Sequence, residues 1–152
     1  MEPPSEQEFE AFLRQVEPGL RRAHFAALGI ERGREATAEA LAWAWEHWPR
    51  IERMRNPAGY LFRVGQSRTR QRKEPPVFVR QEWREPWIEP ALGEALAQLS
   101  EQQRLAVVLI HGFDWTMRDV AELTGTKVPT IQTHLERGLS RLRTSLEVDE
   151  HA

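Results

Sequence analysis

The chain has 152 residues, no cysteine and a net charge of −2. The lack of cysteine excludes disulfide bonds, thiolate zinc sites and thiol redox sensing. No apolar run approaches the roughly 20 residues that span a bilayer, and the acidic start MEPPSEQE is unlike an export signal. We therefore expect a cytoplasmic protein with no membrane insertion.

The first predicted helix begins at a capping box. Ser5 and Glu8 form this box, and apolar residues follow at the spacing of a helix face. Pro18-Gly19 is expected to interrupt or kink the helix, because proline lacks the backbone donor and clashes with the preceding turn. The helical pattern then resumes and ends near Gly29.

A second long helix is predicted over residues 34–48. Its expected core face is the stripe Leu41, Ala44, Trp45 and Trp48. Trp43 falls about opposite that stripe, so we expect it outside the core. A loop is predicted at 49–55, and Asn56-Pro57 is a good start for the next helix.

Basic residues gather in the middle of the chain. Residues 1–20, 21–84 and 85–152 carry net charges of −4, +7 and −5. The excess is densest in one run, whose members are Arg63, Arg68, Arg70, Arg72 and Lys73. Such density attracts phosphate through counterion release. The alternative is a solvated helix end, where Lys and Arg are also favoured.

Residues 74–90 are predicted to form an extended linker, because they contain four prolines and show no helical period. Phe78, Trp83 and Trp87 within it are expected to pack onto a neighbouring domain. Beyond the linker, 91–99 is predicted as helix, and Ser100 opens a further helix over 101–111. Gly112 is expected to close it.

The segment from Thr116 to Arg143 predicts two helices joined by a tight turn. Thr116 fits a helix cap, Gly125 a left-handed end, and Pro129 the first turn of the second helix. The second helix has an apolar stripe at Ile131, Leu135, Leu142 and Leu146, which leaves its polar face free to enter a DNA groove. The alternative is a helical hairpin in an ordinary bundle, and polar Thr124 and Thr126 flank Gly125 where apolar residues are usual.

These elements predict an all-α protein with two small helical domains, at 1–73 and 91–147, a linker at 74–90 and a frayed tail at 148–152. This order of parts resembles a sigma-70 family sigma factor of the extracytoplasmic-function type, a specificity subunit of bacterial RNA polymerase. LSEQQRLAVVLIHGFDWTMRDVAELTG resembles region four, and TIQTHLERGLSRLR resembles its recognition helix. EATAEALAWAW resembles the polymerase-binding helix, and NPAGYLFRVGQSRTRQRK resembles the helix that approaches the minus-10 element.

The resemblance implies two DNA-binding regions. For the minus-35 element these are Lys127, Thr130, Gln132 and Thr133 near base edges, with Arg137 and Arg141 reaching phosphates or flanking bases. For the minus-10 region they are Arg53, Arg55, Arg63, Ser67, Arg68, Arg70, Arg72 and Lys73. Ser67 stands where the family commonly has Asn.

The resemblance also implies which partners the chain binds, and it implies that the chain catalyses no reaction. The polymerase-binding residues would be Glu35, Ala38, Glu39, Ala42 and Trp43, although the family's usual Asp-Leu-Val-Gln is replaced by residues 35–38. Partners would be core RNA polymerase, double-stranded promoter DNA, the opened non-template strand and an anti-sigma protein. A sigma factor is non-catalytic, and we expect no cofactor, metal or small-molecule substrate, because the histidines lack ligand spacing and no glycine-rich phosphate loop is present.

Two other classes of protein fit parts of the pattern. Residues 130–134 also resemble the recognition helix of response-regulator output domains, but the chain lacks the alternating strands of a phosphoacceptor domain. A sigma-derived adaptor would bind polymerase or an anti-sigma protein without initiating transcription. Binding to core polymerase separates sigma factor from regulator, and run-off transcription separates sigma factor from adaptor.

Overall fold

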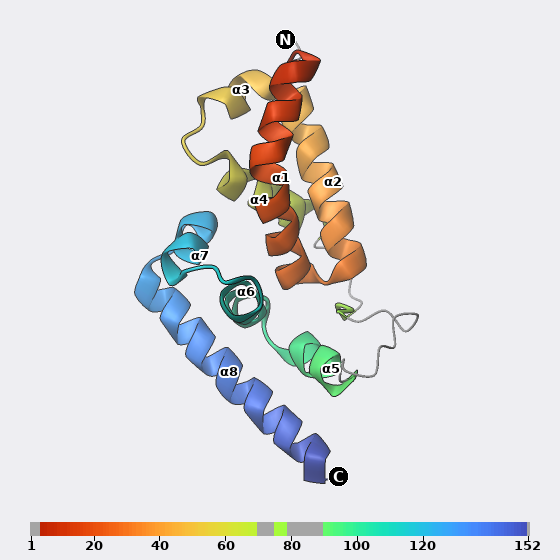
Figure 1. Cartoon of the computed structure of the whole chain (residues 1–152), viewed down its shortest axis with the longest axis vertical. Coiled ribbons are helices and arrows are strands. Elements are labelled where there is room, and N and C mark those ends of the chain that lie inside the picture. The colour runs from red at the N-terminus through yellow and green to blue at the C-terminus, as the bar shows by residue number, and fades with distance from the viewer. Residues whose placement is uncertain (1–3, 70–74, 79–89, 152) are drawn as a thin grey trace.

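The computed structural model describes residues 4–69, 75–78 and 90–151, and within them all regular structure is helical, as predicted. Figure 1 shows two groups of helices, with the chain ends at opposite ends of the molecule. The amino-terminal group is α1 (Glu6–Leu28), α2 (Ile30–Glu46), α3 (Trp48–Arg53) and α4 (Pro57–Thr69). The carboxyl-terminal group is α5 (Pro90–Gln98), α6 (Glu101–Val107), the π-helical turn η2 (Val108–Gly112), α7 (Met117–Thr124) and α8 (Val128–His151).

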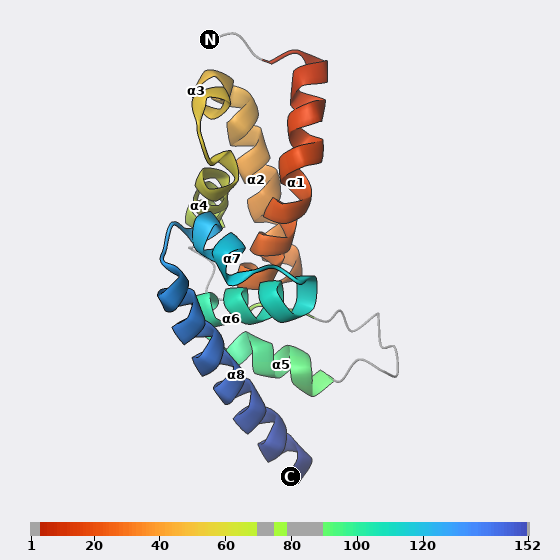
Figure 2. The same cartoon turned by 60° about the vertical axis from the view of Figure 1, so that its left-hand side comes forward.

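The amino-terminal domain is built on close helix contacts. α1 and α2 lie antiparallel, and α4 packs against both (Figure 2). The contact is close because small residues line it: Ala23, Ala27, Ala36, Ala40 and Ala44 are all fully or almost fully buried. At Gly33 an added Cβ would stand 2.9 Å from the His24 carbonyl oxygen, so no larger residue fits there.

Several sequence predictions about this domain are wrong. The predicted interruption at Pro18 does not occur, and α1 runs through it, because its buried stripe Val16, Leu20, Ala23 and Ala27 continues on both sides of the proline. α2 begins at Ile30, directly after Gly29, and not at residue 34. The predicted loop at 49–55 contains α3, which starts with proline in its first turn and buries Ile51.

The predicted core stripe of α2 is confirmed at Ala44 and wrong at Trp45, and its other members, Leu41 and Trp48, are half-buried. The buried positions are Gly33, Ala36, Thr37, Ala40 and Ala44. Trp45 is 38% exposed and meets the edge of Phe9 with ring centroids 4.9 Å apart. α2 does have one buried face at helical spacing, but small residues, and not the large ones, face α1 and α4.

In the carboxyl-terminal domain, the helix predicted over 101–111 has two parts. α6 ends at Val107, and the π-helical turn η2 continues from it through Gly112. Residues 148–151 of the predicted frayed tail are helical, since α8 extends to His151. The two domains are not separate bodies. Leu105, Ala106 and Leu109 belong to the same buried cluster as Leu20 and Ala27 of α1.

Candidate nucleic-acid interface

The helix-turn-helix forms as the capping pattern predicted. The Thr116 hydroxyl accepts a hydrogen bond from the Asp119 amide at 3.0 Å, and the Asp119 carboxylate accepts one from the Thr116 amide at 3.0 Å. The hydrogen bond from the Thr116 backbone amide to the carboxylate is the main cause that lowers the pKa of Asp119. Gly125 ends α7 with φ +69°, in the left-handed region that glycine tolerates.

The hydroxyl groups of Thr124 and Thr126 form a hydrogen bond with each other at the turn. Their hydroxyl oxygens lie 2.8 Å apart, and the Thr124 hydroxyl also donates to the Val120 carbonyl at 2.8 Å. Polar residues are therefore compatible with this tight turn, although apolar ones were expected there.

The first two turns of α8 present a polar row to solvent. Ile131 and Leu135 are buried, which fixes the rotation of the helix in the domain. Four predicted minus-35 residues are consequently exposed together at its amino end: Lys127, Thr130, Gln132 and Thr133. The Gln132 amide donates to Glu136 at 3.3 Å, and the Thr133 hydroxyl donates to the Pro129 carbonyl at 3.1 Å.

The two arginines farther along α8 differ from each other. Arg137 is exposed. Arg141 is exposed too, but its guanidinium donates to the Gln103 side chain and to the Gln98 carbonyl, both at 3.0 Å. Arg141 thus fastens α8 to the α5–α6 connection, a role that the sequence did not indicate.

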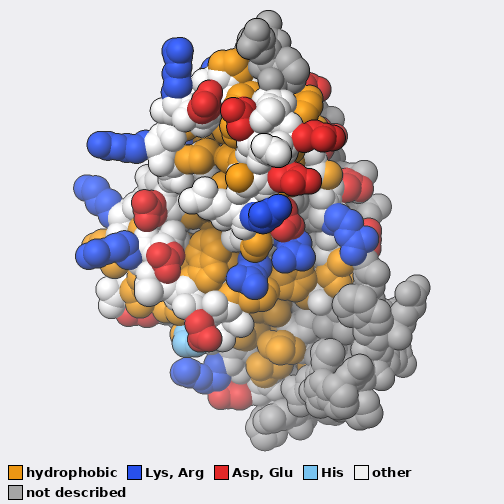
Figure 3. Space-filling view, turned by 45° about the horizontal axis from the view of Figure 1, so that its top comes forward, with side chains coloured by type: hydrophobic (Ala, Val, Ile, Leu, Met, Phe, Trp, Pro, Cys, Tyr) orange, Lys and Arg blue, Asp and Glu red, His pale blue; other side chains and the backbone are white. Residues whose placement is uncertain are grey.

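The amino-terminal domain presents a second basic surface. Arg53, the last residue of α3, and Arg55, in the connection to α4, are both exposed. Arg63, Ser67 and Arg68 are exposed on α4. Basic side chains project along one edge of the molecule in Figure 3, with acidic and apolar ones between them. The other predicted members, Arg70, Arg72 and Lys73, lie outside the described residues.

Aromatic rings and guanidinium groups meet beside this basic surface. Trp43 stacks on His47, with centroids 4.1 Å apart and planes 12° apart, and lies 5.2 Å from Tyr60. The Arg50 guanidinium lies 5.6 Å from the Trp43 ring centroid and 5.9 Å from that of Tyr60, and Arg63 lies 6.0 Å from the Tyr60 ring. Such a platform can stack unpaired bases.

Sequence reasoning missed Tyr60 and Arg50 as members of this platform. The i, i+4 spacing of Trp43 and His47 would have placed those two rings on one helix face. The approach of Arg50 depends on α3, where the sequence predicted a loop, so no local signal could have found it.

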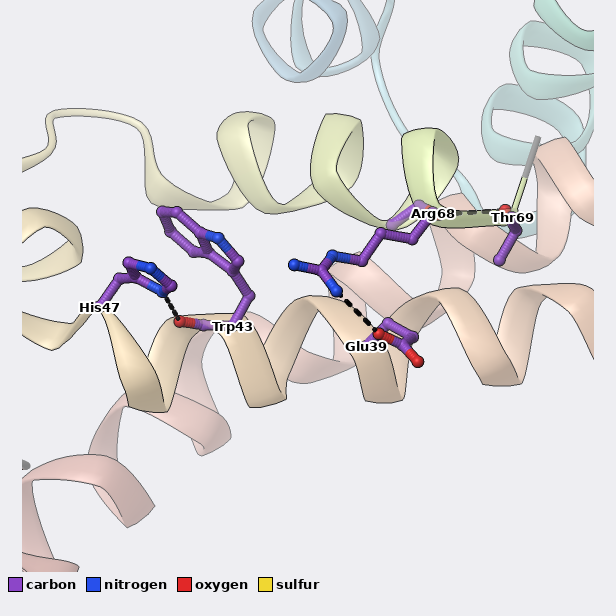
Figure 4. A network of polar contacts seen from close by, with 6 residues as sticks. Glu39, Trp43, His47, Arg68 and Thr69 are labelled. Carbon is purple, nitrogen blue, oxygen red and sulfur yellow. Dashed lines mark hydrogen bonds and ion pairs between the residues drawn. The ribbon is translucent and has the colours of Figure 1, made fainter. Parts of the chain in front are cut away.

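The predicted polymerase-binding residues form one row along α2. Ala38, Glu39 and Ala42 are exposed, whereas Glu35 and Trp43 are half-buried. Arg68 of α4 pairs with Glu39 at 3.4 Å (Figure 4), so the expected polymerase and DNA surfaces adjoin. Trp43 points toward α4, and it is covered in part by Tyr60 and His47.

The described part of the chain contains no group of three or more His, Asp or Glu residues arranged to hold a metal ion. Its helices include none with the length and apolar character needed to cross a membrane.

Comparisons with known proteins agree with this architecture. The family model described as sigma-70, region 4 matches residues 90–142. No curated protein matches the chain. Two solved structures share its fold. The sigma factor RpoE, in complex with the anti-sigma factor NepR from Bartonella quintana, is 24% identical, with TM-score 0.66 over 94% of this chain and 99% of that one. CnrH, in complex with the cytosolic domain of CnrY, is 17% identical, with TM-score 0.62 over 95% of this chain and 92% of that one.

The family match covers α5, α6, η2, α7 and most of α8, which are the elements that build the helix-turn-helix. The structural likeness extends over both domains. Residues 90–142 of the carboxyl-terminal domain therefore match region 4 of the sigma-70 family, and the chain as a whole shares the fold of the sigma factor RpoE.

Proposed function

We propose that the chain is a sigma factor, which binds core RNA polymerase and directs transcription initiation at specific promoters. One observation carries the proposal. The amino end of α8 exposes Lys127, Thr130, Gln132 and Thr133 together, on a capped helix-turn-helix within the region 4 match. A recognition helix meets base edges with its amino-terminal residues.

In the minus-35 element, α8 enters the major groove amino end first. Gln132 offers both a donor and an acceptor to a base edge, and Thr130 and Thr133 offer hydroxyl groups. Lys127, at the start of this row, also lies near base edges, whereas Arg137 is an exposed cation farther along α8 and contacts phosphates or flanking bases.

In the minus-10 region, the amino-terminal domain holds the opened non-template strand. Arg53, Arg55 and Arg68 neutralise phosphates, and Tyr60, beside Arg63, stacks unpaired bases. Cations beside aromatic rings suit single strands, because every base has a face that can stack.

The exposed row on α2 binds the polymerase, with small Ala38 and Ala42 allowing close approach beside Trp43. RpoE, which shares the fold, was solved with an anti-sigma factor, and we propose that this chain also has an anti-sigma partner. The protein acts in the cytoplasm as a non-catalytic subunit, without cofactor or metal.

Run-off transcription tests the proposal. Core polymerase with this chain, on templates carrying the chain's own upstream region, should give a discrete transcript that core polymerase alone does not. Binding to core polymerase without a transcript would favour the adaptor. DNA binding without binding to core polymerase would favour the regulator.

A further inference from the structure

The side chain of Thr133 presents a hydrogen-bond acceptor on the exposed face of α8. Its hydroxyl donates to the Pro129 carbonyl at 3.1 Å, one turn earlier in the helix. A carbonyl oxygen only accepts hydrogen bonds, so this contact uses the single hydroxyl proton of Thr133. Because Thr133 is exposed, the lone pairs of its Oγ1 atom remain open to a second partner that donates.

The neighbouring side chain of Gln132 is oriented by Glu136. The Gln132 amide nitrogen Nε2 donates to the Glu136 carboxylate at 3.3 Å, across one turn of α8. An ionised carboxylate only accepts hydrogen bonds, so it fixes which end of the planar amide lies beside it. The Oε1 oxygen of Gln132 is bonded to the other side of the amide carbon and is therefore turned away from Glu136.

Three acceptors thus lie together on one exposed arc of α8. They are Gln132 Oε1, Thr133 Oγ1 and the Glu136 carboxylate, and we call these three residues the acceptor trio. At roughly 100° per residue they fall within about 100° of one another around the helix axis. Ile131 and Leu135 are buried, which turns this arc toward solvent.

Each base pair displays one amino group and one keto oxygen in the major groove. The amino group is N6 of adenine or N4 of cytosine, and the oxygen is O4 of thymine or O6 of guanine. The two groups belong to opposite strands, so a set of acceptors distinguishes which strand carries the amino group. A keto oxygen facing the acceptor trio would place acceptors against acceptors, and the Glu136 carboxylate would repel it.

We infer that the acceptor trio, whose contact with DNA rests on the proposed function, reads the amino groups of adenine and cytosine in the minus-35 element. Glu136 is a positioning residue, because it keeps the oxygen of Gln132 leading into the groove. As an i, i+4 contact on a helix surface it stabilises the helix only weakly, so its main effect is on the amide. Lys127 and Arg137, which donate, precede and follow the trio in the chain and contact other groups of the element.

Base analogues test which group of a pair is read. The affinity of the complex of core polymerase with the full chain is measured by competition on promoter duplexes altered at one base. Replacing adenine by 2-aminopurine, or cytosine by 2-pyrimidinone, removes the amino group from the major groove and still allows pairing. Replacing thymine by 4-thiothymine, or guanine by 6-thioguanine, exchanges the keto oxygen for sulfur, a poor acceptor.

The informative pairs are those whose preference is lost in Gln132→Ala or Thr133→Val. At these pairs, removing the amino group should lower affinity about tenfold, whereas sulfur in place of the keto oxygen should change it little. A larger loss from the sulfur analogues, or no loss from removing the amino group, would overturn the inference. A wild-type complex that prefers no sequence in the element would instead overturn the proposed function.

The substitution Glu136→Gln tests the positioning role. It keeps the shape of the side chain but allows it to donate as well as accept, so the Gln132 amide is free to turn either way. The loss caused by removing the amino group should therefore shrink severalfold. Glu147→Gln, at an exposed position farther along α8, removes the same charge and should keep the full loss. An equal loss in the two variants would overturn the role of Glu136, and a general electrostatic effect would appear in both.

Discussion

Arg104 and Ala27 are 77 residues apart in sequence, yet the guanidinium of one donates two hydrogen bonds to the carbonyl of the other. Burial lowers the pKa of Arg104, because a desolvated cation is less stable than one in water. The Ala27 and Leu99 carbonyls offset that cost with short hydrogen bonds. The contact therefore depends on both partners remaining in place.

Arg104→Met should lower the free energy of unfolding by about 3 kcal/mol, because methionine fills part of the space but leaves buried carbonyls without a donor. Chemical denaturation monitored by tryptophan fluorescence measures the change. Arg118→Met, at an exposed position of α7, should change stability by less than about 0.5 kcal/mol. Equal stability of the two variants would show that the Arg104 bonds contribute nothing net.

Gln132→Ala and Thr133→Ala should each relax sequence preference in the minus-35 element. We expect a loss of about 1 to 3 kcal/mol on the preferred sequence for each good base contact, with little change on unrelated DNA. Competition binding against a set of single-base variants measures this. A uniform loss across all sequences would contradict base readout by α8.

Arg53→Ala, Arg55→Ala and Arg68→Ala should weaken binding to all sequences alike. Each lost phosphate contact should reduce the slope of log affinity against log salt by about 0.9 on duplex DNA, or about 0.7 on a single strand. Arg14→Ala removes an exposed cation of α1 that pairs with Glu10, and should leave the slope unchanged. An identical slope in all four variants would show that Arg53, Arg55 and Arg68 make no phosphate contacts.

Trp43→Ala should lower affinity for core polymerase by about 2 kcal/mol, as truncation of an aromatic hot spot does. Trp45→Ala is the matched control on the same helix. Because Trp45 is 38% exposed, we expect it to cost about 1 to 2 kcal/mol of stability, and not the 3 to 5 kcal/mol of a fully buried aromatic. Melting curves and polymerase titrations on the pair separate folding from binding. Equal polymerase affinity in both variants would contradict a clamp surface at Trp43.

Stability should fall as the pH drops below neutrality, because of His24. Burial lowers the pKa of His24 from 6.5 to about 4, against a smaller raising effect of its hydrogen bond to the Phe62 carbonyl. Between those values the unfolded chain binds the proton and the folded chain does not, so stability is complete above about pH 6.5 and is lost toward pH 4. We expect a loss of about 2 kcal/mol between pH 7 and pH 5. His24→Gln should flatten this dependence, whereas exposed His111→Gln should retain it.

Local sequence signals determined much of this protein. The capping boxes at Ser5, Ser100 and Thr116 all form, and Gly125 adopts the predicted left-handed turn. These features need only residues close in sequence, because a cap and its partner lie within one helical turn. The exposed row at the start of α8 follows from helical period alone, once Ile131 and Leu135 face inward.

Tertiary structure decided which residues of each helix face the core and which distant side chains meet. The sequence predicted a core stripe of large residues in α2, but three helices meet so closely that only glycine, alanine and threonine fit between them, and Trp45 is left outside. Arg50 joins Trp43 and Tyr60 only because α3 brings it there. Arg104 meets Ala27, and Phe78 meets Phe25, because the two groups of helices share one core. Such contacts depend on the packing of distant segments, which residue spacing along one helix does not specify.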